Sequence, residues 1–229
     1  MKKKTVAIFS LLLSDFYTVM RSKVSFMQRD KVEFAKEGVT QAQLDAIGPM
    51  LKEYNDLPTD DELLGDEVIA TQAKNKIKEQ LHTKIEDVLN KVANKYGAES
   101  GYYRKFGIHS LSKLDGGKLL IGARRVLRVG KSMLTDLAEK GLTQAMLTDL
   151  ETVTEEFDVA LANQEDTASD RGIATDNRIE KANAIYTLVV KYCDVGKRIW
   201  VSTNEAKYND YVIYDTPSGK PEEPVVAKA

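Results

Sequence analysis

Residues 34–44 read FAKEGVTQAQL and residues 137–147 read LAEKGLTQAML, which gives six identities in eleven positions at an offset of 103 residues. Self-similarity at a fixed spacing indicates a repeat architecture. The match extends along the chain at Tyr54-Asn55 with Phe157-Asp158 and, after a slip of one residue, at Ile69-Ala70-Thr71 with Ile173-Ala174-Thr175. The sequence therefore predicts an internal duplication of a unit of about one hundred residues.

Two corners are predicted within these matching segments. Gly38 and Gly141 stand where a helix ends on a residue with left-handed backbone, and an apolar residue follows each. Thr40 and Thr143 come next, as N-caps of the following helix. These four residues are the predicted repeat corners.

The periodicity of apolar residues predicts three helices in each copy. In the first copy, one helix follows Ser14 or Asp15 as its cap, a second is kinked or broken at Gly48-Pro49, and a third begins at the capping box Thr59 to Glu62. In the second copy, the helix corresponding to the third one is expected from about Asp166 to Trp200.

Three short segments have an isoleucine-centred apolar pattern that predicts extended structure: residues 6–10, 106–110 and 211–215. Their backbone groups need partners. We expect them to pair with one another in a small sheet within one chain. Pairing between chains by strand addition is the alternative.

The predicted fold is therefore mainly all-α, with two tandem three-helix units. The expected parts are an N-terminal extended segment (1–15), helical repeat 1 (16–100), a joint with an extended segment (101–117), helical repeat 2 (118–202), a C-terminal extended segment (203–216) and a disordered tail (217–229).

The composition excludes several classes of protein. The 229 residues are 42% apolar and 30% charged with only 5 Pro, which is typical of a soluble globular chain rather than a disordered one. The net charge of −2 argues against a nucleic-acid partner. One cysteine, Cys193, and two histidines, His82 and His109, leave little material for metal or imidazole chemistry. We expect no cofactor, no metal site and no catalytic residue.

The first residues resemble a secretory signal, because Lys2, Lys3 and Lys4 precede TVAIFSLLLS. The similar segment at 106–111 favours a structural role instead, since a cleaved peptide should have no interior copy. We therefore expect the segment to be retained, with Ile8 and Phe9 buried against helices. No stretch approaches the roughly 20 apolar residues of a membrane span, and a cytoplasmic location is expected, with an envelope or virion component as the alternative.

Several motifs suggest chemistry and are better explained structurally. Residues 129–132 (VGKS) lack the earlier glycine of a phosphate-binding loop. The acidic run 60–62 suits the first turn of a helix. Cys193 is interpreted as a buried small apolar residue, although a reactive thiol stays open. The basic residues Arg124, Arg125, Arg128 and Lys131 are expected to be solvated or paired with acids, with contact to an anionic surface as an alternative.

The densest aromatic group consists of Trp200, Tyr208, Tyr211 and Tyr214. Such residues are enriched at the centres of interfaces, although closing the protein's own core uses them equally well. They are the candidate interface residues.

The corner TQAML, the IAT segments and the ending EAKYNDYVIYDTPSG resemble a group of uncharacterised two-repeat helical proteins of Bacteroidota and their phages. The resemblance implies an architecture and a bacterial or phage origin, and it assigns no site residue. The sequence thus favours a non-catalytic structural or interaction protein, whose partners are proteins and include its own copies. The alternatives are a helical carrier or sensor that binds a small ligand between the repeat units, and, behind both, an enzyme.

Overall fold

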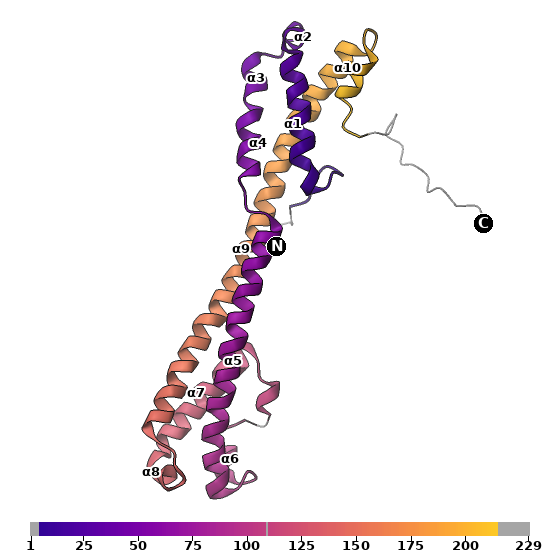
Figure 1. Ribbon diagram of the computed structural model, residues 1–229. Helices are drawn as coiled ribbons and strands as arrows, with labels where there is room; N and C mark the ends of the chain where they lie inside the picture. The colour runs from indigo at the N-terminus through magenta and orange to yellow at the C-terminus, as the bar shows by residue number, and fades with distance from the viewer. Residues whose placement is uncertain (1–4, 109, 215–229) are drawn as a thin grey trace, which may run out of the picture. The chain divides into compact units, whose positions relative to one another are not determined.

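The structure, a computed structural model, describes residues 5–108 and 110–214, and all regular structure there is helical (Figure 1). The elements in chain order are α1 (Leu13–Arg29), α2 (Lys31–Lys36), α3 (Gln41–Asp45), α4 (Ile47–Asn55), α5 (Asp60–Tyr96), α6 (Gly101–Arg104), η1 (Leu111–Lys113), α7 (Gly116–Ser132), α8 (Leu134–Leu137), η2 (Ala138–Lys140), α9 (Gln144–Trp200) and α10 (Glu205–Asp210). The described residues contain no strand, so the prediction of an all-α protein is confirmed.

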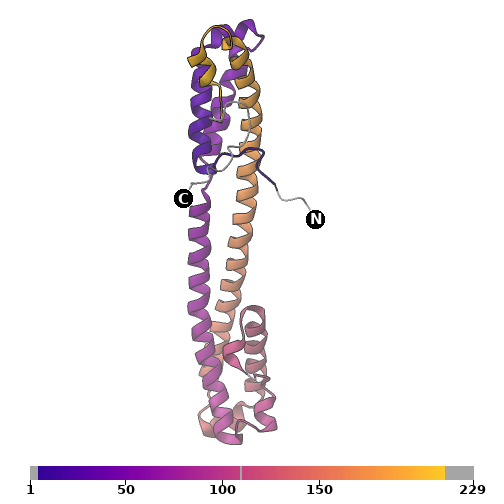
Figure 2. The ribbon, with the colours of Figure 1, turned by 90° about the vertical axis from the view of Figure 1, so that its right-hand side faces the viewer.

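The chain forms two compact units, with boundaries after Pro58 and after Gly172. Unit 1 holds α1 to α4, the C-terminal part of α9 and α10. Unit 2 holds α5 to α8 and the N-terminal part of α9. Within unit 2, α5 and α9 run side by side in opposite directions (Figure 2).

These units do not coincide with the predicted repeats at 16–100 and 118–202. The third helix of each repeat, α5 or the C-terminal part of α9, packs with the first two helices of the other repeat. The cause lies in α9, which runs unbroken from Gln144 to Trp200, so that the helix expected to begin near Asp166 is only its continuation. A continuous helix cannot fold back on its own first half. Its two ends therefore pack against different helices.

The core of unit 1 lies between α1, α4 and α9. Phe16 and Met20 of α1, Ile47 of α4, and Ile185 and Val189 of α9 are at most 1% exposed. Their spacing of three or four residues gives each helix one apolar stripe. Burial of these stripes holds unit 1 together.

The core of unit 2 is likewise built from three helices, here α5, α7 and the N-terminal part of α9. Leu81, Ile85 and Val88 of α5 pack with Leu119 of α7 and Leu147 of α9. Helix α7 begins and ends 103 residues after α1, and Leu119 is 103 residues after the buried Phe16. Helix ends and buried positions thus recur at the offset seen in the sequence.

The predicted corners are present at both glycines. Gly38 has φ +79° and Gly141 has φ +81°, both in the left-handed region. The Thr40 hydroxyl accepts a hydrogen bond from the Gln43 backbone N–H at 3.3 Å, and the Thr143 hydroxyl accepts one from the Met146 N–H at 3.2 Å. The first corner is a full capping box, because the Gln43 side chain also accepts from the Thr40 N–H. Methionine at 146 cannot do so.

The prediction of three short strands is wrong for the described residues. Residues 106–107 close turns onto Tyr103 and Arg104. Within the region 203–216, residues 205–210 form helix α10, capped by the Asn204 side chain, and residues 211–214 form no strand. His109 and Asp215 lie outside the described residues, as does the tail 217–229.

The residues before α1 also depart from expectation. Helix α1 begins at Leu13 with Leu12 as N-cap, so neither Ser14 nor Asp15 caps it. Ile8 is 58% exposed rather than buried, whereas Phe9 is half-buried and lies 4.7 Å from Phe16 between ring centroids. None of the helices described is both long enough and apolar enough to cross a membrane.

Candidate functional site

The predicted interface residues all lie in unit 1, around the end of α9. Trp200 is the last residue of α9, and a short turn leads to Asn204, whose side-chain oxygen accepts from the Lys207 N–H at 3.0 Å and starts α10. Tyr208 lies on α10 and Tyr211 directly follows it. Helix α10 thus faces the break between α1 and α2.

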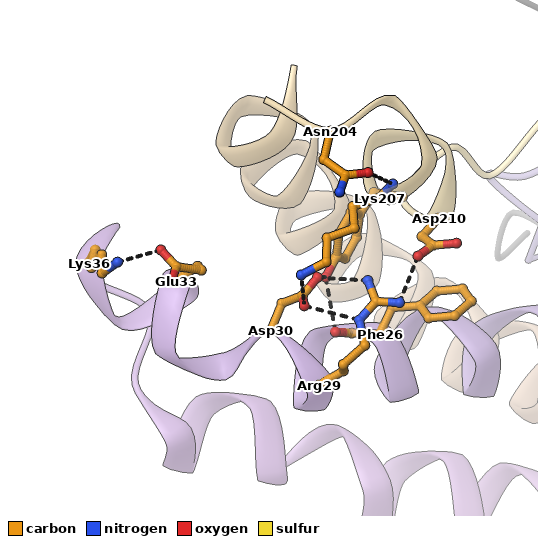
Figure 3. A network of polar contacts seen from close by, with 9 residues as sticks. Phe26, Arg29, Asp30, Glu33, Lys36, Asn204, Lys207 and Asp210 are labelled. Atoms are coloured by element: carbon orange, nitrogen blue, oxygen red, sulfur yellow. Dashed lines mark hydrogen bonds and ion pairs between the residues drawn. The ribbon is translucent and has the colours of Figure 1, made fainter. Parts of the chain in front are cut away.

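A buried carboxylate at that break organises a polar cluster, defined here as Arg29, Asp30, Lys207, Asp210 and Tyr211, of which Figure 3 labels the first four. Asp30 separates α1 from α2, and its side chain is 2% exposed. Arg29 donates to both Asp30 oxygens, at 3.0 and 2.8 Å, and Lys207 donates to Oδ1 at 3.0 Å. The Tyr211 hydroxyl lies 2.9 Å from Oδ2 and 3.0 Å from the Phe26 carbonyl. Arg29 also pairs with Asp210 at 2.8 Å.

The electrostatics keep Asp30 ionised. Burial acts to raise the pKa of Asp30, but hydrogen bonds from Arg29, Lys207 and Tyr211 together outweigh burial and hold the pKa at about 2. Burial and the bond to Asp30 raise the pKa of the Tyr211 phenol above its usual value. The cluster is therefore a charged, hydrogen-bonded connection between α10 and the α1–α2 break.

Tyr211 is a core residue and not part of an exposed interface, which corrects its assignment to the candidate surface. It is 0% exposed, and its ring lies 5.7 Å from that of Phe34 between centroids. A Cβ added at Gly196 would lie 2.5 Å from the Tyr211 ring, so glycine at 196 provides the space that the ring occupies. For Tyr211, the observation supports the alternative that the aromatic residue closes the protein's own core.

The other three aromatic residues are partly accessible. Trp200 and Tyr208 are half-buried, and the Lys207 ammonium lies 3.9 Å from the Trp200 ring centroid, a cation–π contact. Tyr214 is 37% exposed, and its hydroxyl accepts from the Ser10 N–H at 3.0 Å and lies 3.1 Å from the Tyr186 hydroxyl. Lys207 thus contacts Trp200 and shares the acceptor Asp30 with Tyr211. Tyr214 instead bonds Ser10, in the segment before α1.

The other residues that the sequence singled out lie in ion pairs, inside helices or in the core. Arg124 pairs with Asp158 at 2.6 Å and Lys131 with Glu151 at 2.7 Å, as expected for these two residues, whereas Arg125 donates to the Gly107 carbonyl at 3.3 Å. Residues 129–132 lie inside α7, and residues 60–62 form the first turn of α5. Cys193 is 1% exposed, and burial raises the pKa of its thiol to about 12, which keeps it protonated. Among the residues described, no group of His, Cys, Asp and Glu could hold a metal ion.

Two features escaped the sequence reasoning. The first feature is the buried carboxylate of Asp30. The corresponding residue 103 positions later is the buried Met133, so a charged residue at a position that is apolar in the other copy was the signal that could have indicated it. The second feature is that Ile69 and Ile173, which begin the matching IAT segments, are each 65% exposed. The recurrence of the two isoleucines is visible in the sequence. Their exposure is not, because both lie in helices that also contain buried apolar residues, and an apolar residue in such a helix is expected to be buried.

Comparison with protein-family models, with curated proteins and with solved structures finds no match to this chain.

Proposed function

We propose that this chain is a non-catalytic interaction protein, which binds a protein partner through one similar helical surface in each unit. The observation that supports the proposal is the repeated exposure of isoleucine in the IAT segments. Ile69 on α5 in unit 2 and Ile173 on α9 in unit 1 are equally exposed, at 65%.

The two isoleucines differ from the other exposed apolar residues in that they recur. Ile121 and Val159 are 60% and 70% exposed, but their counterparts 103 residues earlier are Thr18 and Asp56. Among the exposed large apolar residues of the described chain, Ile69 and Ile173 are the one pair of corresponding positions at which both side chains are large, apolar and exposed. A core does not account for this recurrence, because neither side chain is in a core.

The local structure around Ile69 presents it on a firm surface. Ala70, the next residue, is 5% exposed, and the Thr71 hydroxyl accepts from the Gln164 side chain of α9 at 3.3 Å. The helix is thereby held with Ile69 outward. Apolar anchors on one helix face are the usual means by which a helix docks with a protein partner, and full burial of such a side chain contributes about 1.5–3 kcal/mol.

The test compares two double variants of the full chain. Ile69→Ser with Ile173→Ser removes both proposed anchors, and Ile121→Ser with Val159→Ser is the control of matched exposure. Sedimentation velocity measures self-association, and affinity capture from the native host followed by mass spectrometry measures other partners. We expect wild type and the control variant to form a complex, and the amount of that complex to be at least tenfold lower with the anchor variant. Equal binding by the two variants, or no complex with wild type, would refute the proposal.

A further inference from the structure

The first part of α5, residues 60–80, is covered by little of the rest of unit 2. Ala70 is the one buried residue in this stretch. The contacts to α9 here include ion pairs, because Arg171 binds Asp60 and Glu67, each at 3.0 Å. A helix gains most of its stability from the packing of an apolar face against neighbours. The stretch therefore has room for a further packing partner on its other side.

The side of α5 away from these contacts forms one continuous surface, the outer face. Its residues are exposed and, apart from Ile69, follow one another at steps of three or four, which places them on one side of a helix. They are Asp61, Gly65, Val68, Ile69, Gln72 and Lys76. Val68 and Ile69 are 45% and 65% exposed and give the outer face an apolar centre.

The charge along this stretch of α5 is strongly asymmetric. Residues 60–67 contain five acids and no base, whereas residues 74–78 contain three lysines and no acid. The apolar centre lies between them. Such a surface is complementary to itself when a second copy lies antiparallel, because each acidic end then meets a lysine end. A parallel arrangement would place like charges opposite each other, which is unfavourable.

The positions of the residues also define a register. A two-fold axis between Val68 and Ile69 places Val68 of one copy opposite Ile69 of the other. Asp61 lies seven residues before Val68, and Lys76 lies seven residues after Ile69. The axis therefore places Asp61 of each copy opposite Lys76 of the other, the reciprocal pairing that two-fold symmetry requires. Both side chains are exposed, and neither belongs to an ion pair among the described residues.

Gly65 gives an independent indication of a close partner. Glycine inside a helix is less stable than alanine. A Cβ built at Gly65 would have no atom within 4 Å, so packing within the chain does not require glycine there. In the register above, Gly65 lies opposite Gln72, three residues on either side of the axis. The missing side chain leaves space for the long one and for a close approach of the second helix.

We propose that residues 60–80 of α5 pair antiparallel with the same residues of a second copy, so that the chain forms a symmetric dimer through the outer face. The proposal rests on the proposed function, because Ile69 is one of its two anchors, and it identifies the partner of that anchor as a second copy. The apolar centre provides affinity. The Asp61–Lys76 pairs select the antiparallel orientation.

Charge reversal in the full chain, measured by sedimentation velocity, tests the pairing. Asp61→Lys alone, or Lys76→Glu alone, places like charges opposite each other at two points of the dimer. Each variant should dimerise about tenfold more weakly than wild type. An equimolar mixture of the two variants should regain wild-type dimerisation, because opposite charges meet at both points of the mixed dimer. The double variant Asp61→Lys with Lys76→Glu should also dimerise as wild type does.

The matched controls are Lys118→Glu and Glu156→Lys, which reverse the charge of exposed helical residues of unit 2 outside the outer face. Each should dimerise as wild type does, and circular dichroism should show equal helix content in all variants. A monomeric wild type overturns the proposal. Wild-type dimerisation of the single variants, failure of their mixture to dimerise, or equal loss in the controls also overturns it.

The failure of this proposal is distinguishable from failure of the proposed function. If wild type is monomeric or ignores the charge reversals, but binding of another protein falls at least tenfold with Ile69→Ser and Ile173→Ser, the second copy is the wrong partner and the two anchors remain. If those serine substitutions also leave all binding unchanged, both proposals are wrong.

Discussion

At the scale of single residues, Gly38 and Gly141 show how the backbone requirement of one position sets a corner. Both have left-handed φ. A Cβ built at Gly38 would have no neighbouring atom within 4 Å, and one built at Gly141 would have only the Lys91 ammonium, at 3.8 Å. A side chain at these positions therefore meets conformational strain but no steric clash. The strain follows from L-chirality and is about 1–2 kcal/mol.

We predict that Gly38→Ala and Gly141→Ala each lower the free energy of unfolding by about 1 kcal/mol, because the reduced entropy of the unfolded chain offsets part of the strain. Urea denaturation measures this. Gly65→Ala is the control, since Gly65 lies inside α5 without positive φ or nearby atoms, and alanine there should stabilise by about 0.5–1 kcal/mol. Destabilisation by all three substitutions would contradict the corner assignment.

Asp30 provides a pH-dependent prediction at the same scale. Its pKa is depressed in the folded chain, so its contribution is complete above the ordinary value of 3.8 and is lost as pH falls through about 2. The shift corresponds to about 2 kcal/mol. Between pH 5 and pH 2, the unfolding free energy of wild type should fall by about 2 kcal/mol more than that of Asp30→Asn.

Tyr211→Phe is the companion variant for this measurement, because it keeps the buried ring and removes one hydrogen bond to Asp30. It should lower stability at pH 7 by about 1–2 kcal/mol and retain part of the pH dependence. Parallel pH profiles for wild type and Asp30→Asn would show that Asp30 carries no such contribution.

At the scale of elements, the contrast between α9 and the α4–α5 pair has a local cause. Pro58 and the Thr59 capping box separate α4 from α5, and the Thr59 hydroxyl accepts from the Glu62 N–H at 3.3 Å. The residue 103 positions after Pro58 is Leu161, inside α9. Proline blocks helix propagation whereas leucine favours it. Proline at 58 thus ends the helical run between α4 and α5, whereas leucine at 161 allows α9 to continue as one helix.

Introducing the proline of the first copy into the second tests this account. Leu161→Pro should lower the unfolding free energy by about 3 kcal/mol or more, because it removes a hydrogen bond inside α9 and clashes with the preceding turn. Leu161→Ala, which loses side-chain packing and keeps the backbone, is the control and should cost clearly less. Equal effects of the two substitutions in denaturant titrations would argue against a continuous α9.

At the scale of the whole molecule, each compact unit combines helices from both predicted repeats. Every buried residue of the unit 2 core lies between Leu81 and Phe157, within the continuous stretch Thr59–Gly172. The core of unit 1 instead draws on residues 16–54 and 182–211. The unit that is continuous in sequence can therefore be separated from the rest without loss of core partners.

We predict that a fragment of residues 59–172 folds alone, with helical circular dichroism and a cooperative thermal transition. A fragment of residues 16–100, the predicted repeat 1, should not, because it lacks the residues of α9 that complete the core of α1 and α4 and the residues of α7 and α9 that pack on α5. Cooperative folding of 16–100 with no transition for 59–172 would reverse the assignment of the units.

The amino-acid sequence by itself determined the helical class, the corners at Gly38 and Gly141, the capping box at Thr59 and the paired or buried state of the residues that resembled chemical motifs. These are local properties, set by backbone preference and by periodicity within one element. The tertiary structure alone decided that Tyr211 is buried and that Asp30 joins α10 to α1. It also decided that the Asn183 side chain bonds the backbone of Val6 and Ile8, and that the third helix of each predicted repeat packs outside that repeat. These depend on partners more than one hundred residues away, and apolar periodicity states that a face is buried without stating which helix buries it.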